Sequence, residues 1–298
     1  MIEWLSPPDP WKNHHVACES RHSDSAAWFV QGNTFSEWKV SEALSSLLWV
    51  HGKRSWILGS GAFQRLRCFF FVAGAGKSVF WCVKLLIFPS LEFIVLASST
   101  IIEDIDGMRK AGLASLAFFY CDFREERKTS LRGILSSLLV QLCHQSDSYY
   151  DVLFRFYSEH TDGFRHPSDK ALMGCLKDLL KLSNLAPVYL IVDALDECPK
   201  IPAIRSPRSQ VLNLIAELIN LKFPNLRICV TSRPATDIKD VLDPLIPHYV
   251  SLHDERGQKR DIDEYIKSVI KTHPETGSWK EENMQLVIDV LTERADGM

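Results

Sequence analysis

The sequence lacks any Cys-x-x-Cys pair, although it contains eight cysteines, and its ten histidines lack the spacing typical of metal ligands. These absences argue against a zinc site or a disulfide framework and predict buried thiols of a reducing compartment. His14 and His15 are accordingly expected to be a solvated pair.

A net charge of -3 gives no electrostatic sign of a nucleic-acid-binding surface, so no nucleic-acid partner is expected. No basic segment followed by an apolar core opens the chain, so no secretory signal is expected, and repeats of 20–50 residues are also missing.

The sequence also lacks an uninterrupted apolar segment that would suit a membrane. Residues 79–97 are mostly apolar and span about the length of a transmembrane helix. Lys84, Pro89 and Glu92 lie within them, and a charge at mid-span costs about 2.5–3.5 kcal/mol. We therefore expect no membrane-spanning helix here and a cytoplasmic location. The 298 residues are enough for one α/β domain and a smaller appendage.

Glycine is missing at one informative position in a glycine-rich stretch. Residues 73–78 read Ala-Gly-Ala-Gly-Lys-Ser, and the phosphate-binding pattern asks for a further Gly where the chain has Phe71. Between a strand and a helix, such a turn surrounds phosphates with backbone N–H groups, while the Lys reaches the outer phosphates and the Ser binds Mg²⁺. An ordinary surface loop is the alternative. The candidate nucleotide-binding residues are Gly74, Ala75, Gly76, Lys77, Ser78 and Val79.

An acidic segment follows about 115 residues later. Residues 188–193 form an apolar run that ends in a carboxylate, which is typical of a parallel strand buried on both faces. Asp193 would lie at the carboxyl end of that strand, where open α/β sheets bind ligands, and could hold Mg²⁺ through water. Asp196 or Glu197 could then orient or deprotonate an attacking water. The alternative is an acidic turn that only caps the next helix.

A second apolar run, residues 226–234, ends in polar groups and a cation before Pro234 stops the strand. Thr231, Ser232 or Arg233 could contact a terminal phosphate from the neighbouring strand. Alternatively, Arg233 is a surface residue after a strand.

Together these three segments resemble the NACHT nucleotide-binding domain, most closely the fungal nephrocystin-like branch of the STAND signalling NTPases. The resemblance covers roughly residues 28–298 with two interruptions, and its Asp-Ala-Leu-Asp-Glu segment, residues 193–197, is specific. It implies a P-loop NTPase three-layer α/β sandwich with a parallel five-stranded sheet, followed by the start of a helical lid. It also implies ATP or GTP with Mg²⁺, bound by Ser78 and Asp193, with Lys77 on the outer phosphates and Arg233 sensing the γ-phosphate.

The resemblance divides the chain into three parts. Residues 1–40 would be a lead-in with a short docking helix, and the stretch 1–25 within it is expected to be poorly ordered. Residues 41–252 would form the nucleotide-binding domain, and residues 253–298 the beginning of the lid. Stretches of about 54–72 and 80–97 do not match the family and are rich in apolar residues, which favours the hypothesis that they are retained intron sequence or another gene-model artefact.

Local patterns predict most elements of the domain. Thr100 and Glu103 form a capping-box pattern that would restart a helix, and Thr129 or Ser130 would cap another. Residues 68–72 would supply a replacement strand before the glycine-rich turn, and residues 78–88 the helix after it. Further strands are expected at 47–52, 113–123 and 248–252, and further helices at 149–160, 171–182, 210–221, 237–242, 261–271 and 281–294.

We expect an NTP-dependent signalling switch in which slow hydrolysis controls conformation and self-association. Its partners would be the nucleotide, further copies of itself and signalling proteins. The resemblance associates such switches with fungal self/non-self recognition. The alternative is a non-catalytic scaffold or decoy, or the product of a misannotated gene, whose phosphate loop is disrupted by the two foreign stretches.

Overall fold

A computed structural model describes most of the chain up to Ser251 and little after it. The described residues are 1–19, 27–41, 44–51, 89–160, 163–182, 186–201, 206–246 and 248–251, with 281–282, 284–285 and 289 near the C-terminus. The glycine-rich turn at 73–78, the expected strand at 68–72, the expected helices at 78–88 and 261–271 and nearly all of the expected lid therefore lie outside the described residues.

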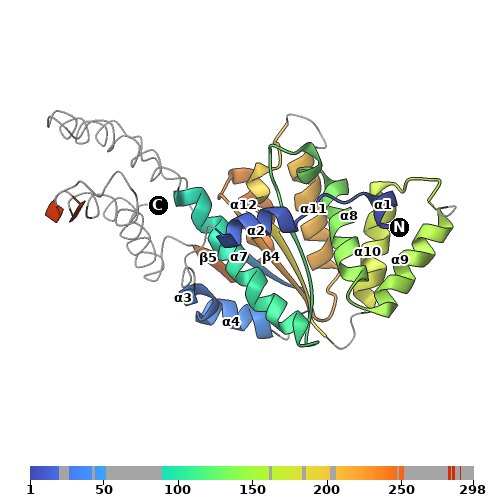
Figure 1. The fold of residues 1–298 in the computed structure, drawn as a ribbon, viewed down its shortest axis with the longest axis horizontal. Coiled ribbons are helices and arrows are strands. Elements are labelled where there is room, and N and C mark those ends of the chain that lie inside the picture. The colour runs from blue at the N-terminus through green and yellow to red at the C-terminus, as the bar shows by residue number, and fades with distance from the viewer. Residues whose placement is uncertain are drawn as a thin grey trace.

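The centre of the fold is a parallel sheet in the order β2-β3-β4-β1-β5 (Figure 1). Each neighbouring pair of strands runs in the same direction. An α/β fold with a parallel sheet is therefore confirmed, and the apolar runs in the sequence mark its strands. These are β1 (Ser46–His51), β2 (Ser115–Tyr120), β3 (Val188–Asp193), β4 (Leu226–Ser232) and β5 (His248–Ser251).

Helices cover both faces of the sheet, because the buried strands present apolar side chains to both sides. One face carries α1 (Ile2–Leu5), α8 (Leu131–Cys143), α9 (Asp147–Glu159), α10 (Asp169–Lys181), α11 (Pro207–Asn220) and α12 (Thr236–Leu242). The opposite face carries α2 (Trp11–Glu19), α3 (Ala27–Val30), α4 (Asn33–Val40) and α7 (Pro89–Lys110). Short 3-10 turns in the described part of the chain are η1 (Glu126–Lys128), η2 (Leu195–Glu197) and η3 (Asp243–Leu245).

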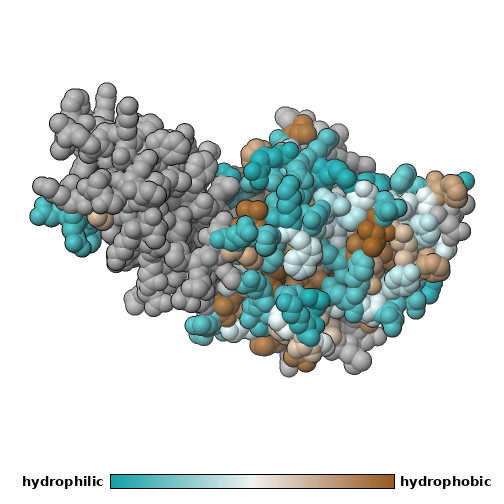
Figure 2. All heavy atoms as spheres, in the orientation of Figure 1, coloured by the Kyte–Doolittle hydropathy of each residue, from teal (hydrophilic) through white to brown (hydrophobic). Residues whose placement is uncertain are grey.

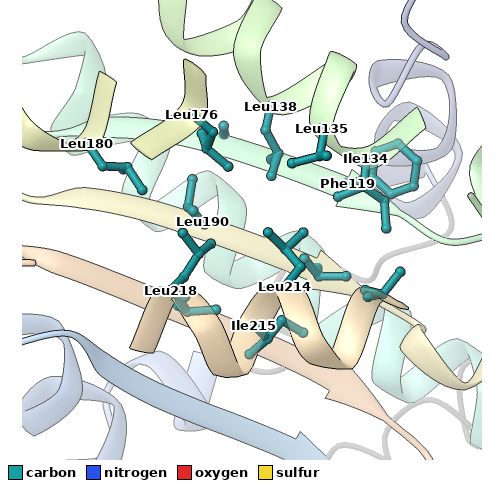
Figure 3. Close-up of a cluster of buried hydrophobic side chains, with 14 of the residues drawn as sticks. Phe119, Ile134, Leu135, Leu138, Leu176, Leu180, Leu190, Leu214, Ile215 and Leu218 are labelled. Carbon is teal, nitrogen blue, oxygen red and sulfur yellow. The ribbon is translucent and has the colours of Figure 1, made fainter. Parts of the chain in front are cut away.

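Two hydrophobic cores result from the alternation of side chains along each strand. Figure 2 shows a surface around α2 and α7 that is mainly hydrophilic, with apolar residues in scattered patches. Inside, Phe119 of β2 and Leu190 of β3 contact leucines of α8, α10 and α11 (Figure 3). Their neighbours Phe118 and Ile191 point to the other core, with α7. Side chains along a strand alternate between the two faces of the sheet, so Asp193, two residues after Ile191 at the end of β3, lies on the same side as α7.

The connections of β1 and β4 leave the sheet on opposite faces. The chain after β1 reaches α7 on one face, whereas the chain after β4 enters α12 on the other. β1 and β4 are neighbours, so the carboxyl ends of these two strands flank a topological switch point. Open α/β sheets bind their ligands at such a crevice.

Several local expectations are confirmed. Ser130 caps α8, because its hydroxyl oxygen accepts a hydrogen bond from the backbone N–H of Gly133 at 3.1 Å. α9, α10, α11 and α12 agree with their predicted ranges within a few residues. Of the six cysteines in the described ranges, five are buried and all are free thiols.

Two expectations about the course of the chain are wrong. The stretch 1–19 is not a poorly ordered lead-in: it forms α1 and α2, and Leu5 is part of the main core. The pattern at Thr100 does not restart a helix either, because α7 runs through it from Pro89 to Lys110. The buried Ile101, Ile102 and Ile105 pack on the sheet, and this packing outweighs the capping preference of Thr100.

None of the helices that the structure describes is both long enough and apolar enough to cross a membrane.

Helix α4 is held to the sheet by an aromatic contact, which generates a stability prediction. The ring of Trp38 is fully buried and packs edge-on against Tyr189 of β3, with centroids 5.6 Å apart. We expect Trp38→Ala to lower the free energy of unfolding by about 3–5 kcal/mol, because it leaves a cavity in the core. Trp11→Ala is the matched control, since Trp11 is 48% exposed. Urea unfolding checks the prediction, and equal losses in the two variants would contradict it.

Candidate functional site

The carboxyl end of β3 places a buried acid beside the end of β4. Asp193 is 1% exposed, and its Oδ1 accepts a hydrogen bond from the Thr231 hydroxyl at 2.5 Å. A second hydrogen bond comes from the side chain of Ser98 on α7. These contacts join two strands and a helix around one carboxyl group.

The surroundings of Asp193 favour its protonated form. Burial raises the pKa of this carboxyl to about 7, and the nearby Glu197 and Asp196 add to the rise. The hydrogen bonds from Thr231 and Ser98 oppose it. The carboxyl group therefore changes charge near neutral pH, in contrast to an ordinary aspartate, and a cation beside it would favour the charged form.

A left-handed residue directly after β3 turns the chain at this edge. Ala194 has a φ of 53°, and its N–H donates to the Thr231 hydroxyl oxygen at 2.9 Å. This conformation costs an alanine about 1–2 kcal/mol. The turn directs residues 195–197 back along the sheet edge as η2, so that the segment's three acids lie close together.

Asp196 and Arg233, which were expected to act on water and on a phosphate, contact each other. The carboxylate of Asp196 accepts a hydrogen bond from the Arg233 backbone N–H at 3.0 Å and pairs with its Nε at 2.8 Å. The carboxylate is largely buried, whereas the Arg233 side chain is 32% exposed. The guanidinium can thus meet a ligand without leaving the site.

Glu197 lies on the side of the site nearest β2. Its Oε2 accepts a hydrogen bond from the backbone N–H of Phe123 at 3.1 Å. Burial is the main cause that raises the pKa of Glu197. The raised pKa suits Glu197 to a role in which a group exchanges a proton with water. The neighbouring acid Asp122 differs: Arg124 pairs with both of its oxygens, at 2.8 and 2.7 Å, and lowers the pKa of Asp122 to about 2.

The other polar groups expected at this edge are already engaged. The Thr231 hydroxyl donates to Asp193, and the Ser232 hydroxyl accepts a hydrogen bond from the indole Nε1 of Trp49 at 2.9 Å. That second bond joins β4 to β1 across the switch point. Of the three candidates at the end of β4, Arg233 is therefore the one that can reach a ligand.

Sequence reasoning missed Arg208, which supports the acidic turn from behind. Its guanidinium donates hydrogen bonds to the backbone carbonyls of Cys198, at 2.9 Å, and of Asp196. It also contacts Asp237 of α12 at 3.4 Å. An arginine at the start of an amphipathic helix carries no local signal of such contacts.

The structure thus brings together Asp193, Asp196, Glu197 and Arg233 at one sheet edge. Gly74, Ala75, Gly76, Lys77, Ser78 and Val79 lie outside the described residues. The described part of the site offers one buried carboxyl group for a cation, one half-buried acid and one partly exposed guanidinium.

Comparison with known proteins places this edge within a family match. Residues 95–233 match the family described as Nephrocystin 3, N-terminal. The match covers just under half of the chain, from α7 to Arg233, and so includes the acidic turn but not the glycine-rich stretch. A search of curated proteins found no match. The likeness to nephrocystin-type domains predicted from the sequence is therefore supported for this central part.

The contacts of Arg208 predict a substantial loss of stability in Arg208→Ala. Its side chain is 13% exposed, so removing it leaves two carbonyl groups without a donor, at a cost of about 1–3 kcal/mol. Lys200→Ala is the matched control, because Lys200 pairs with the same Asp237 but is 61% exposed, and such pairs contribute about 0–1 kcal/mol. Urea unfolding of both variants checks this. A larger loss in Lys200→Ala would contradict it.

The raised pKa of Asp193 predicts a pH dependence of stability. In the unfolded chain the carboxyl ionises near 3.8, whereas the folded protein keeps the proton to about 7. The folded state binds more protons between these values, so the free energy of unfolding falls as pH rises from 4 to 7, by at most about 1.4 kcal/mol per pH unit. Asp193→Asn should lack this fall. Metal-free urea unfolding at several pH values tests it, and parallel curves for the two proteins would contradict it.

Proposed function

We propose that this protein binds a magnesium complex of ATP or GTP at the carboxyl edge of its sheet and acts as a conformational switch. The observation that carries the proposal is the buried carboxyl group of Asp193, held by Thr231 and Ser98 beside the switch point of the sheet. A buried acid with a pKa near neutral is stabilised in its charged form by a divalent cation. A buried acid without such a role would be costly to keep.

The order of the chain supports the same assignment. β1 ends at His51 and leads into the segment that contains Lys77 and Ser78, and α7 returns from that segment with Ser98 against Asp193. We propose that Lys77 contacts the outer phosphates and that Ser78 and Asp193 hold Mg²⁺. Backbone N–H groups of residues 74–79 would surround the phosphates.

The pair formed by Asp196 and Arg233 provides a route from nucleotide to conformation. A terminal phosphate near Arg233 would compete with Asp196 for the guanidinium, since Arg binds phosphate and carboxylate in the same geometry. Loss of the pair would free η2 from the end of β4. Glu197, with its raised pKa, would orient the attacking water during slow hydrolysis. We propose that this exchange controls self-association.

Nucleotide titration tests the proposal. We expect a fluorescent ATP or GTP analogue to bind the purified chain in the presence of Mg²⁺, and Lys77→Ala and Asp193→Asn to weaken binding at least about tenfold, which is about 1.4 kcal/mol. Lys170→Ala, an exposed lysine at the start of α10, is the matched control and should bind as the wild type does. Equal binding by all four proteins would show that the nucleotide lies elsewhere.

A non-catalytic scaffold remains the second candidate, and Phe71 favours it. A phenylalanine where the pattern asks for glycine obstructs close approach of the backbone to phosphates. If neither the wild type nor Phe71→Gly binds nucleotide while both show the far-ultraviolet circular dichroism of a folded α/β protein, the scaffold is favoured and the switch is rejected. Gain of binding in Phe71→Gly would show that this residue alone blocks the site.

A further inference from the structure

Three side chains that can bind metals converge between α2 and α7, outside the acidic turn. They are His14 and Cys18 of α2 and Glu103 of α7, and their ligand atoms all lie within 4.8 Å of one another. His14 Nε2 lies 3.5 Å from the Cys18 sulfur, and that sulfur lies 3.4 Å from Glu103 Oε1. Sequence reasoning predicted a solvated His14, but the side chain is 7% exposed.

The secondary structure explains why these groups meet. His14 and Cys18 are four residues apart on a helix, so both side chains lie on the same face of α2. α2 runs alongside α7 on the surface of the sheet, which brings Glu103 to that face (Figure 1). The third donor comes from a segment 85 residues away in sequence, so no spacing rule along the chain could reveal the set.

We propose that His14, Cys18 and Glu103 form a zinc site with water as the fourth ligand. Zinc prefers nitrogen, sulfur and carboxylate donors in a tetrahedral arrangement, with bonds of about 2.0–2.3 Å. In a tetrahedron with such bonds, nitrogen–sulfur and sulfur–oxygen separations are about 3.6 Å. The observed separations of 3.5 and 3.4 Å are close to this value.

The neighbouring groups support a metal at this place. His14 Nδ1 lies 3.0 Å from the Tyr120 hydroxyl. Zinc on Nε2 would fix the ring proton on Nδ1, which would donate to the Tyr120 oxygen, as ligating histidines usually do to a second group. Lys110 of α7 pairs with Asp106 at 2.9 Å, and this pair reduces its repulsion of a cation. The thiolate among the donors favours zinc over Mg²⁺ or Ca²⁺.

A metal here would attach the first helices to the sheet and connect to the acidic turn. Tyr120 ends β2, and the Ser98 side chain hydrogen-bonds with both Tyr120 and Asp193. The zinc ligands are therefore joined to the buried carboxyl group through Tyr120 and Ser98. With ligands from both helices, the metal would hold α2 on α7.

Metal binding by the purified, metal-free full chain tests the proposal. Zinc affinity is measured by competition with a chromophoric chelator, and Co²⁺ serves as a spectroscopic probe. We expect one Co²⁺ per chain with tetrahedral d–d bands and a near-ultraviolet charge-transfer band from the thiolate. Cys18→Ser should lose that band and bind zinc at least about tenfold more weakly, and Glu103→Gln should weaken zinc binding while keeping the band.

Cys143→Ser is the matched control, because Cys143 also lies near a histidine, 3.9 Å from His144 Nδ1, but joins no metal-binding cluster within the described part of the chain. It should bind as the wild type does. Glu103 is exposed, so Glu103→Gln is expected to stay folded, which circular dichroism verifies. No tetrahedral Co²⁺ spectrum in the wild type, or the same spectrum and zinc affinity in Cys18→Ser, would overturn the proposal.

Discussion

A carboxyl group buried at the end of β3 constrains the rest of this fold. Removing Asp193 from water is costly, so its oxygens need donors from the neighbouring strand and from α7, and these come from Thr231 and Ser98. Directly after it, Ala194 adopts a left-handed conformation, and two further acids, Asp196 and Glu197, follow in η2. The first of them, Asp196, pairs with Arg233, and Arg208 donates a hydrogen bond to the backbone carbonyl of the same residue.

Much of this arrangement could be predicted from the sequence, because a strand that is buried on both faces has an unbroken run of apolar residues. Unbroken apolar runs predicted β3 and β4 to within two residues, and the polar residues at the end of each run marked the carboxyl edge of the sheet. Thr129 and Ser130 together indicated the start of α8 by local hydrogen-bond chemistry, and Ser130 is the residue that caps it. Strand ends and helix caps depend on neighbouring residues, and a single sequence contains that information.

Contacts between residues that are far apart in the sequence produce no local pattern, and these are the contacts that could not be predicted from the sequence. α2 is a polar helix whose place depends on contacts with residues far away in sequence, such as His14 with Tyr120 and Asn13 with Lys128. Nothing near Arg208 indicates that its guanidinium reaches the carbonyls of η2. Tertiary packing decides these positions, just as it decides that α7 continues through Thr100.

Because α1 and α2 are part of the fold, the chain cannot be shortened to a fragment that starts at β1 without losing contacts. Lys128 is 2% exposed, and its ammonium donates to Asn13 at 2.6 Å and to Glu125 at 3.1 Å. A fragment that starts at β1 would expose Phe118, against which Trp11 packs, and would leave Lys128 without its partner Asn13. The boundary of the folding unit therefore lies before the sheet begins, and a protein shortened to the sheet and its later helices would lose both solubility and stability.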